Sequence, residues 1–217
     1  MFGNFVTAFC FVALLALPLY AQAQQGPQQK ETKATEGNGQ AKESYEPLVE
    51  KLKKGDLTID FAELRMAFTK TKDFSGYGGL EKKEAFGALD KKDFQKALKL
   101  AEDGLKDDYL DLNAHYVAFI ANRELDKADK AEFHRNVFFK LIEAIQKSGD
   151  GKTPETAFIV IGVDEEYVLI NYLGYRPTQQ GLYRANGHTY DKLSVVNTKT
   201  NETVVFYFQI DTFFGKF

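Results

Sequence analysis

The spacing of the apolar residues changes once along this chain, near Gly151, and that change sets the class of fold. From Pro47 to about Ser148 the apolar residues recur three or four positions apart, which is the period of an α-helix. After Gly151 they fall into short runs rich in Val, Ile, Phe and Tyr, which are typical of β-strands. The sequence therefore predicts an α+β protein in which the helices come first and pack against a sheet formed by the remainder of the chain.

Residues 46–151 are predicted to form helical hairpins. One apolar stripe follows Asp90 as a possible N-cap and comprises Phe94, Ala97, Leu98, Ala101 and Leu105. Short polar joints connect these predicted helices, as they do in stacked hairpins. Residues 93–102 and the helix after them resemble adjoining helices of tetratricopeptide repeats, but no second copy occurs 34 residues away. We therefore expect hairpins that are only partly tetratricopeptide-like.

Residues 152–217 are predicted to form an antiparallel region of four to five strands in one compact unit with the helices. The strongest local signal is Asn186-Gly187, which indicates a tight hairpin turn. Residues 164–166 are read as an acidic turn between two strands, and residues 198–202 as a polar turn between two others. The strands expected around these turns are 157–163, 167–173, 182–185, 188–191, 192–197 and 203–210, the fourth and fifth being adjacent.

Residues 1–23 have the pattern of a secretory signal peptide. An uncharged apolar segment runs from Phe5 to Leu19, and small residues precede an expected cleavage site after Ala23. The positive charge usual before the apolar segment is missing, so an uncleaved anchor is the alternative. The apolar run is shorter than the roughly 20 residues that a spanning helix needs, which favours cleavage. We therefore expect a periplasmic or secreted protein with no stable membrane insertion after processing.

The remaining composition describes a protein without disulfides that carries a flexible N-terminal spacer. The single cysteine, Cys10, lies inside the predicted signal peptide, so the mature chain would contain none. Residues 24–45 contain no aliphatic residue larger than Ala and are predicted to be a disordered linker. The formal net charge of −3 gives no indication of a nucleic acid or an anionic membrane as partner.

Several phrases of the chain together resemble a known family. They are residues 60–74 (DFAELRMAFTKTKDF), 148–158 (SGDGKTPETAF), 164–167 (DEEY), 186–191 (NGHTYD) and 207–211 (YFQID). They are similar to the secreted bacterial family catalogued as domain of unknown function 4919, over roughly residues 45–217. The resemblance implies a bacterial envelope setting and supplies no catalytic residues.

Catalytic and metal-binding patterns are weak in this sequence, so no catalytic residue, metal or cofactor is predicted. The expected mature chain has no cysteine nucleophile, and none of its serines lies in a G-x-S-x-G turn. His134 lies on an apolar helical stripe and is expected to be a hydrogen-bonded core histidine, with His115 on the preceding helix able to face it. Two histidines fall short of the three or four ligands of a zinc site.

Two groups in the predicted sheet region are candidate binding residues. His188 adjoins the Asn186-Gly187 turn and, with Asp191 on the same hairpin, could transfer protons or bind a metal; ordinary turn hydrogen bonds are the simpler interpretation. Asp164, Glu165 and Glu166 place three carboxylates in one turn, where a cation such as calcium would relieve their repulsion. A solvated turn needs no such cation.

Arg65 is the candidate in the helical half, because it lies within an apolar stripe where a charge needs a partner. A structural ion pair with a carboxylate, or an extended stem with an exposed head, would satisfy it. An anion-accepting site near Tyr77 is the functional interpretation.

These observations favour a non-enzymatic module that binds a protein or peptide partner in the cell envelope. The helical hairpins and the weakness of the catalytic patterns carry this hypothesis. The alternative is a metal-dependent or acid/base hydrolase whose site lies on the β region.

Overall fold

The helical part of the chain consists of helices joined by short polar segments. The computed structural model describes residues 43–77 and 80–215, so the predicted signal peptide and nearly all of the predicted linker lie outside the described residues. The helices before the sheet are α1 (Tyr45–Lys53), α2 (Phe61–Phe68), α3 (Lys82–Asp90), α4 (Phe94–Asp107), α5 (Leu112–Glu124) and α6 (Ala128–Gln146). A short 3₁₀ helix, η1 (Pro154–Thr156), leads into the first strand.

Aspartate side chains determine where three of these helices begin. Asp60, Asp93 and Asp111 each accept hydrogen bonds from backbone N–H groups in the first turn of α2, α4 and α5. Asp90, which the spacing suggested as the cap of α4, is instead the last residue of α3. The backbone of Lys92 adopts a φ of 58°, which ends α3 in a left-handed turn and leaves Asp93 to cap the next helix.

The strands form one four-stranded mixed sheet in the order β1-β4-β3-β2. They are β1 (Phe158–Ile159), β2 (Tyr175–Ala185), β3 (His188–Asn197) and β4 (Thr203–Gln209). Strands β2, β3 and β4 pair antiparallel, whereas the two-residue β1 pairs parallel with β4. The prediction of a purely antiparallel sheet was therefore wrong at this edge, because helix α7 (Val163–Tyr172) and the rest of the sheet separate β1 from β4 in the chain.

The turn at Asn186-Gly187 is confirmed as a tight hairpin between β2 and β3. Ala185 pairs with His188, and the two central residues have φ values of 52° and 81°. Positive φ at both positions is the geometry of the turn that matches the twist of antiparallel strands, and Asn followed by Gly adopts it at low cost. Residues 188–191 and 192–197, expected as separate segments, form the single strand β3.

Residues 163–172 form helix α7, so the prediction of an acidic turn between strands 157–163 and 167–173 was wrong. The three carboxylates Asp164, Glu165 and Glu166 occupy the first helical turn, where the helix dipole favours negative charge. The buried face of α7 includes both glutamates together with Leu169 and Ile170. Because two of these four buried residues are glutamates, the apolar residues alone do not show the helical period.

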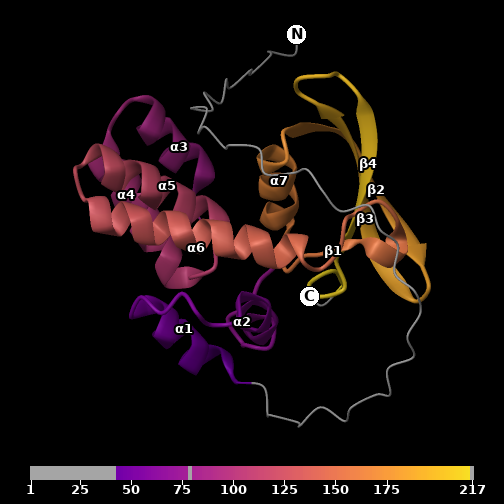
Figure 1. Ribbon diagram of the computed structural model, residues 1–217, viewed down its shortest axis with the longest axis horizontal. Helices are drawn as coiled ribbons and strands as arrows, with labels where there is room; N and C mark the ends of the chain where they lie inside the picture. The colour runs from indigo at the N-terminus through magenta and orange to yellow at the C-terminus, as the bar shows by residue number, and fades with distance from the viewer. Residues whose placement is uncertain (1–42, 78–79, 216–217) are drawn as a thin grey trace, which may run out of the picture. The chain divides into compact units, whose positions relative to one another are not determined.

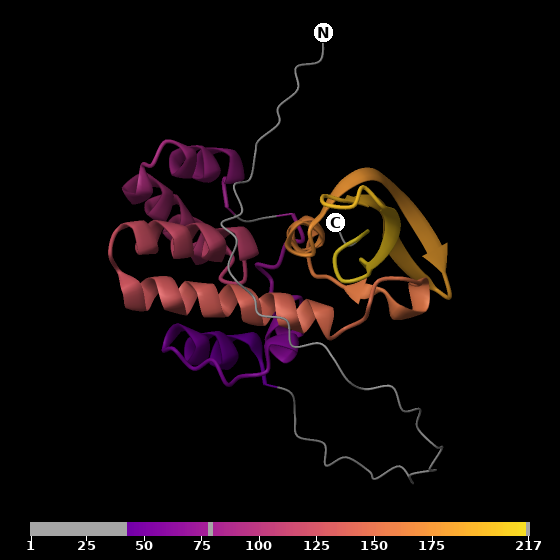
Figure 2. The ribbon, with the colours of Figure 1, turned by 45° about the horizontal axis from the view of Figure 1, so that its top comes forward.

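Helices and sheet share a core, which confirms the α+β class with the helices first. Figures 1 and 2 both show α7 between the helices α3–α6 and the sheet. The larger apolar cluster draws on α1, α2, α6, α7 and the sheet, and its fully buried leucines include Leu52, Leu64, Leu141, Leu169 and Leu193. A smaller cluster made mostly of alanines lies among α3, α4 and α5, where the small side chains allow the helices to approach closely.

Candidate functional site

A groove of about 630 Å³ runs between α1 and the C-terminal end of α4. The segments that line it are α1, the end of α2 and the loop after it, the end of α4 and the joint that follows, and one residue of α6. The lining residues are Tyr45, Glu46, Val49, Glu50, Lys53, Phe68, Thr71, Asp73, Glu102, Leu105, Lys106, Asp107, Tyr109 and His134. This volume lies within the range of roughly 300–1,000 Å³ found for ligand sites in proteins.

Aromatic side chains form part of the groove wall. The rings of Tyr45 and Phe68 lie 4.9 Å apart, and Phe68 meets Phe74 edge to face at 5.4 Å. Across the groove, the ammonium of Lys53 lies 5.3 Å from the centre of the Tyr109 ring. A cation is therefore already held over one aromatic face in this groove, an interaction that also suits an incoming cationic side chain.

The groove has an excess of negative charge. Five carboxylates and two lysines line it, which is a formal charge of −3. Both lysines are engaged within the protein, since Lys53 pairs with Glu50 at 3.1 Å and Lys106 with Asp103 at 2.6 Å. The remaining lining carboxylates make no ion pair with the described part of the chain; they are Glu46, Asp73, Glu102 and Asp107.

His134 of α6 lines one side of the groove, and His115 of α5 lies behind it. His115 is fully buried, and its Nδ1 lies 3.0 Å from Nδ1 of His134, while its Nε2 lies 2.9 Å from the carbonyl oxygen of Tyr109. Burial lowers the pKa of His115 to about 3 and that of His134 to about 4. Both rings are therefore neutral at physiological pH. The expected hydrogen bond of His134 is present, but its side chain is only partly buried and lines the groove.

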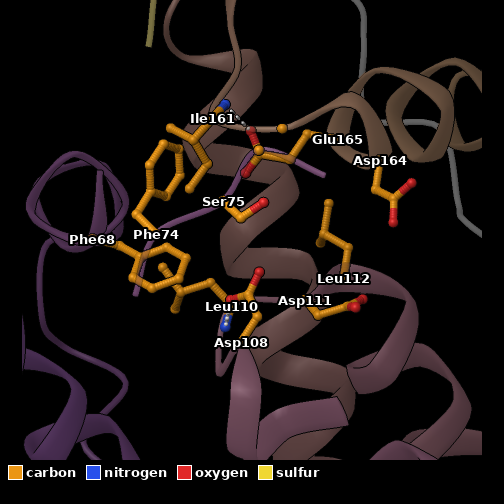
Figure 3. A pocket seen from close by; sticks show the side chains of 12 residues that line it. Phe68, Phe74, Ser75, Asp108, Leu110, Asp111, Leu112, Ile161, Asp164 and Glu165 are labelled. Carbon is orange, nitrogen blue, oxygen red and sulfur yellow. Dashed lines mark hydrogen bonds between the residues drawn. The ribbon is translucent and has the colours of Figure 1, made fainter. Parts of the chain in front are cut away.

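A second, smaller cavity of about 30 Å³ adjoins the groove, and Phe68 lines both (Figure 3). Its volume is enough for about one water molecule. Figure 3 shows carboxylates from the α4–α5 joint on one side and from α7 on the other; they are Asp108, Asp111, Asp164 and Glu165. The cavity is thus an acidic space between the helical layer and the beginning of α7.

All four cavity carboxylates accept hydrogen bonds or form ion pairs, and Asp108 has the fewest partners. Asp111 accepts from the backbone N–H of Leu80 at 2.6 Å besides capping α5. Asp164 pairs with the ammonium of Lys82, and Glu165 with Arg65. No group of three or more residues able to hold a metal ion occurs in the described residues.

Asp108 is the least satisfied carboxylate of this cavity. One of its oxygens accepts from the backbone N–H of Leu110 at 2.8 Å. Burial raises the pKa of Asp108 to about 7, with a further contribution from the nearby charge of Asp111. Asp108 also acts on the groove, because burial and the charge of Asp108 together raise the pKa of Tyr45. Its charge at neutral pH is therefore sensitive to any cation that binds nearby.

The ion pair of Arg65 with Glu165 joins α2 to α7. The Nε and Nη2 atoms of Arg65 donate to the two Glu165 oxygens at 2.8 and 2.5 Å, and Nη2 also donates to the Ile159 carbonyl at 2.9 Å. Glu165 further accepts from the backbone N–H of Ile161 at 2.8 Å. The arginine side chain is only 2% exposed. The expected structural partner of Arg65 is therefore present, and an anion from solution would have to displace Glu165.

Tyr77, unlike the buried Arg65, is exposed: the residue is 62% exposed, and its ring packs edge to face on Phe213 at 5.7 Å. The anion-accepting interpretation stays a prediction without support from this geometry.

Glu166 and Asp191 face each other between α7 and β3. Both side chains are buried, and neither oxygen of Glu166 has a hydrogen-bond donor among the described residues. Burial, together with the charge of Asp191, raises the pKa of Glu166 to about 9. A protonated Glu166 can donate to Asp191, which also accepts from Nε2 of Gln180 at 2.7 Å, and the Tyr167 hydroxyl donates to Oε1 of Gln180 at 2.7 Å.

His188 does not join this carboxyl pair. Because side chains alternate along a strand, positions 188 and 191 of β3 lie on opposite faces of the sheet. The partner of His188 is Asp211, whose Oδ2 lies 2.6 Å from His188 Nδ1 and also accepts from Gln209 at 2.8 Å. Nearly half of the His188 side chain is exposed. The structure therefore places the predicted His188 and Asp191 in separate clusters.

A known protein family matches this chain. A family model described as a domain of unknown function (DUF4919) matches residues 30–216. The chain belongs to this family. Comparison with curated proteins and with solved structures gave no match. The family match confirms the resemblance seen in the sequence, whereas the tetratricopeptide-like character of the hairpins remains unconfirmed. No helix within the described residues is long and apolar enough to cross a membrane.

Sequence reasoning did not identify the groove as a site. Tyr45, a main part of its wall, fell at the end of the predicted disordered linker because its neighbours before it are polar. Asp107, Asp108 and Tyr109 were part of an acidic joint between helices. The only sequence signal near the groove is the pairing of His115 with His134, which predicts core structure.

Proposed function

We propose that this member of the DUF4919 family is a non-enzymatic binding module of the bacterial periplasm or exterior. Its groove binds a segment of a partner protein that carries lysine or arginine side chains. The predicted signal peptide supports the location. The groove between α1 and the end of α4 is the single observation that carries the binding function.

The chemistry of the groove matches a cationic segment. Its aromatic wall, with Tyr45, Phe68 and Tyr109, offers apolar area for the methylene stems of lysine and arginine. Its carboxylates, among them Glu46 and Glu102, offer partners for the charged ends. An anionic segment would instead be repelled by the negative charge of the groove, so the groove favours cationic over anionic segments.

The test is isothermal titration calorimetry with a capped peptide of alternating Lys and Ala, and with the matching peptide of alternating Glu and Ala. We expect heat of binding from the first peptide only. Glu102→Lys places a positive charge in the groove and is expected to weaken binding at least tenfold. Glu202→Lys makes the same change of net charge in the exposed turn between β3 and β4 and serves as the matched control.

Two results would count against the proposal. Equal weakening by the two charge reversals would mean that the peptide responds to overall charge and not to the groove. Equal binding of the lysine and glutamate peptides would remove the argument from charge.

The second candidate function is an acid/base hydrolase with its site on the β region. The observations that favour it are the exposed His188 beside Asp211 and the buried Glu166 near Asp191, where burial raises the pKa of Glu166. The two clusters lie on opposite faces of β3, and the carboxyl pair is buried, so neither offers the open site that the groove does. Full retention of any detected hydrolysis by His188→Ala would end the version centred on that residue.

A further inference from the structure

The hydrogen bonds of the histidine pair determine which nitrogen of each ring carries the proton. A carbonyl oxygen can only accept, so Nε2 of His115 must donate its proton to the carbonyl of Tyr109, 2.9 Å away. A neutral imidazole carries a single N–H, which leaves Nδ1 of His115 as an acceptor. The only donor available to that atom across the 3.0 Å contact is Nδ1–H of His134. His134 is thereby held with its proton on Nδ1 and its lone pair on Nε2.

This arrangement has a consequence for the groove, because His134 lines it whereas His115 is wholly buried behind it. We infer that His134 is a recognition residue, whose Nε2 accepts a hydrogen bond from the ammonium or guanidinium group of the bound segment. The inference rests on the proposed function and adds to it a specific contact and the class of group that makes it. The carboxylates select positive charge, and His134 selects a cation that carries N–H donors.

The environment of His134 favours the neutral ring, which can accept a hydrogen bond, over the protonated, positively charged ring. Its partner His115 is fully buried, and Lys130 on the same helix lies close enough to disfavour protonation of the ring. A protonated His134 would repel a cationic ligand, whereas the neutral ring presents only its lone pair. Permanently charged quaternary ammonium groups, which have no N–H, would gain nothing from this atom.

The test compares three peptides and two variants by calorimetry at pH 7. The lysine peptide is set against the same peptide with trimethylated lysines, which keep the charge and lose the N–H donors. We expect wild-type protein to bind the unmodified peptide about tenfold more tightly, the effect of one hydrogen bond to a charged group. His134→Phe keeps an aromatic ring without nitrogen and is expected to abolish this preference, whereas His188→Phe, on the sheet, is expected to preserve it. The glutamate peptide is the third ligand and again tests whether binding depends on the sign of the peptide's charge.

Nitrogen-15 NMR of the histidine rings tests the same inference in the wild-type protein, without any variant. We expect His134 to carry its proton on Nδ1 in the free protein and its Nε2 resonance to shift when the lysine peptide is added. A proton found on Nε2 of His134, or a preference for N–H donors that survives in His134→Phe, would overturn the inference while leaving groove binding intact. Absence of any binding by the lysine peptide would overturn the proposed function and this inference with it.

Discussion

Replacing Glu166 by Gln should remove a pH dependence from the stability of the protein. Glu166 is fully buried beside Asp191, and its pKa rises from an ordinary 4.5 to about 9, chiefly because of burial. The folded protein therefore keeps the proton on Glu166 at neutral pH, whereas the unfolded chain releases it above pH 4.5. A Gln at this position is neutral at every pH and can still donate a hydrogen bond to Asp191.

The sign and size of the effect follow from proton linkage. Between pH 4.5 and pH 9 the folded state binds more protons at Glu166 than the unfolded state does, so the free energy of unfolding falls as the pH rises. Each unit of pH in this window costs about 1.4 kcal/mol. From pH 4.5 to pH 7 the wild-type protein should therefore lose about 3 kcal/mol of stability that the Glu166→Gln variant keeps.

The measurement is chemical denaturation by guanidinium chloride, followed by far-ultraviolet circular dichroism, at pH 4.5, 5.5, 7 and 8.5. The quantity of interest is the difference in unfolding free energy between variant and wild type as a function of pH, in which titrating groups that do not interact with Glu166 cancel. We expect this difference to shift by about 3 kcal/mol in favour of the variant between pH 4.5 and pH 7. Glu202→Gln, at an exposed turn position, is the control and should show no such trend.

A difference that stays constant with pH would refute the reasoning, because it would mean that Glu166 titrates alike in the folded and unfolded states. Such a result would also end the description of the pair as a carboxyl group and a carboxylate that share a proton.

Two further changes test the other buried carboxylates. Arg65→Ala leaves the buried Glu165 without its partner and should lower the unfolding free energy by about 3–5 kcal/mol, measured by the same denaturation experiment at pH 7; a loss below about 1 kcal/mol, the size of a surface pair, would contradict the burial of the contact. Asp108→Asn keeps an oxygen to accept from Leu110 but removes a group whose pKa burial raises to about 7, so the variant should gain about 4 kcal/mol relative to wild type between pH 4 and pH 8. Parallel pH profiles for the two proteins would show that Asp108 is ionised in the native state well below pH 7.

Much of the fold could be predicted because local sequence rules were obeyed. The change from helical to strand spacing near Gly151 gave the α+β class and the order of its two parts. The Asn186-Gly187 turn gave one hairpin correctly, since that pair adopts positive φ at both positions at low cost. These signals depend on a few neighbouring residues and need no knowledge of the tertiary structure.

Helix α7 could not be predicted from apolar spacing because its inward positions include charged residues. Glu165 and Glu166 are buried only because Arg65 and Asp191 meet them, and those partners lie 100 and 25 positions away in the chain. The type of partner for Arg65, a carboxylate, could be inferred from its place in an apolar stripe. The identity of that carboxylate depends on the tertiary structure, as does the partner of His188.

The groove could not be predicted from the sequence for the same reason, because its residues come together only in the tertiary structure. Its wall joins α1 to the end of α4, and the two are separated by more than 40 residues of sequence. No one of these segments has a motif of its own. The aromatic and acidic residues that give the groove its character become a site only where α1 and the end of α4 meet.

Adjacent residues at the start of α7 show how this protein holds its two layers together. Glu165 faces α2 and accepts two hydrogen bonds from Arg65, whereas Glu166 faces β3 and retains its proton beside Asp191. Successive residues of a helix are about 100° apart, so neighbouring glutamates point toward different elements. One helical turn therefore contacts the helices through an ion pair and the sheet through a buried carboxyl group. The attachment to the sheet depends on pH, because Glu166 loses its proton as the pH rises toward 9.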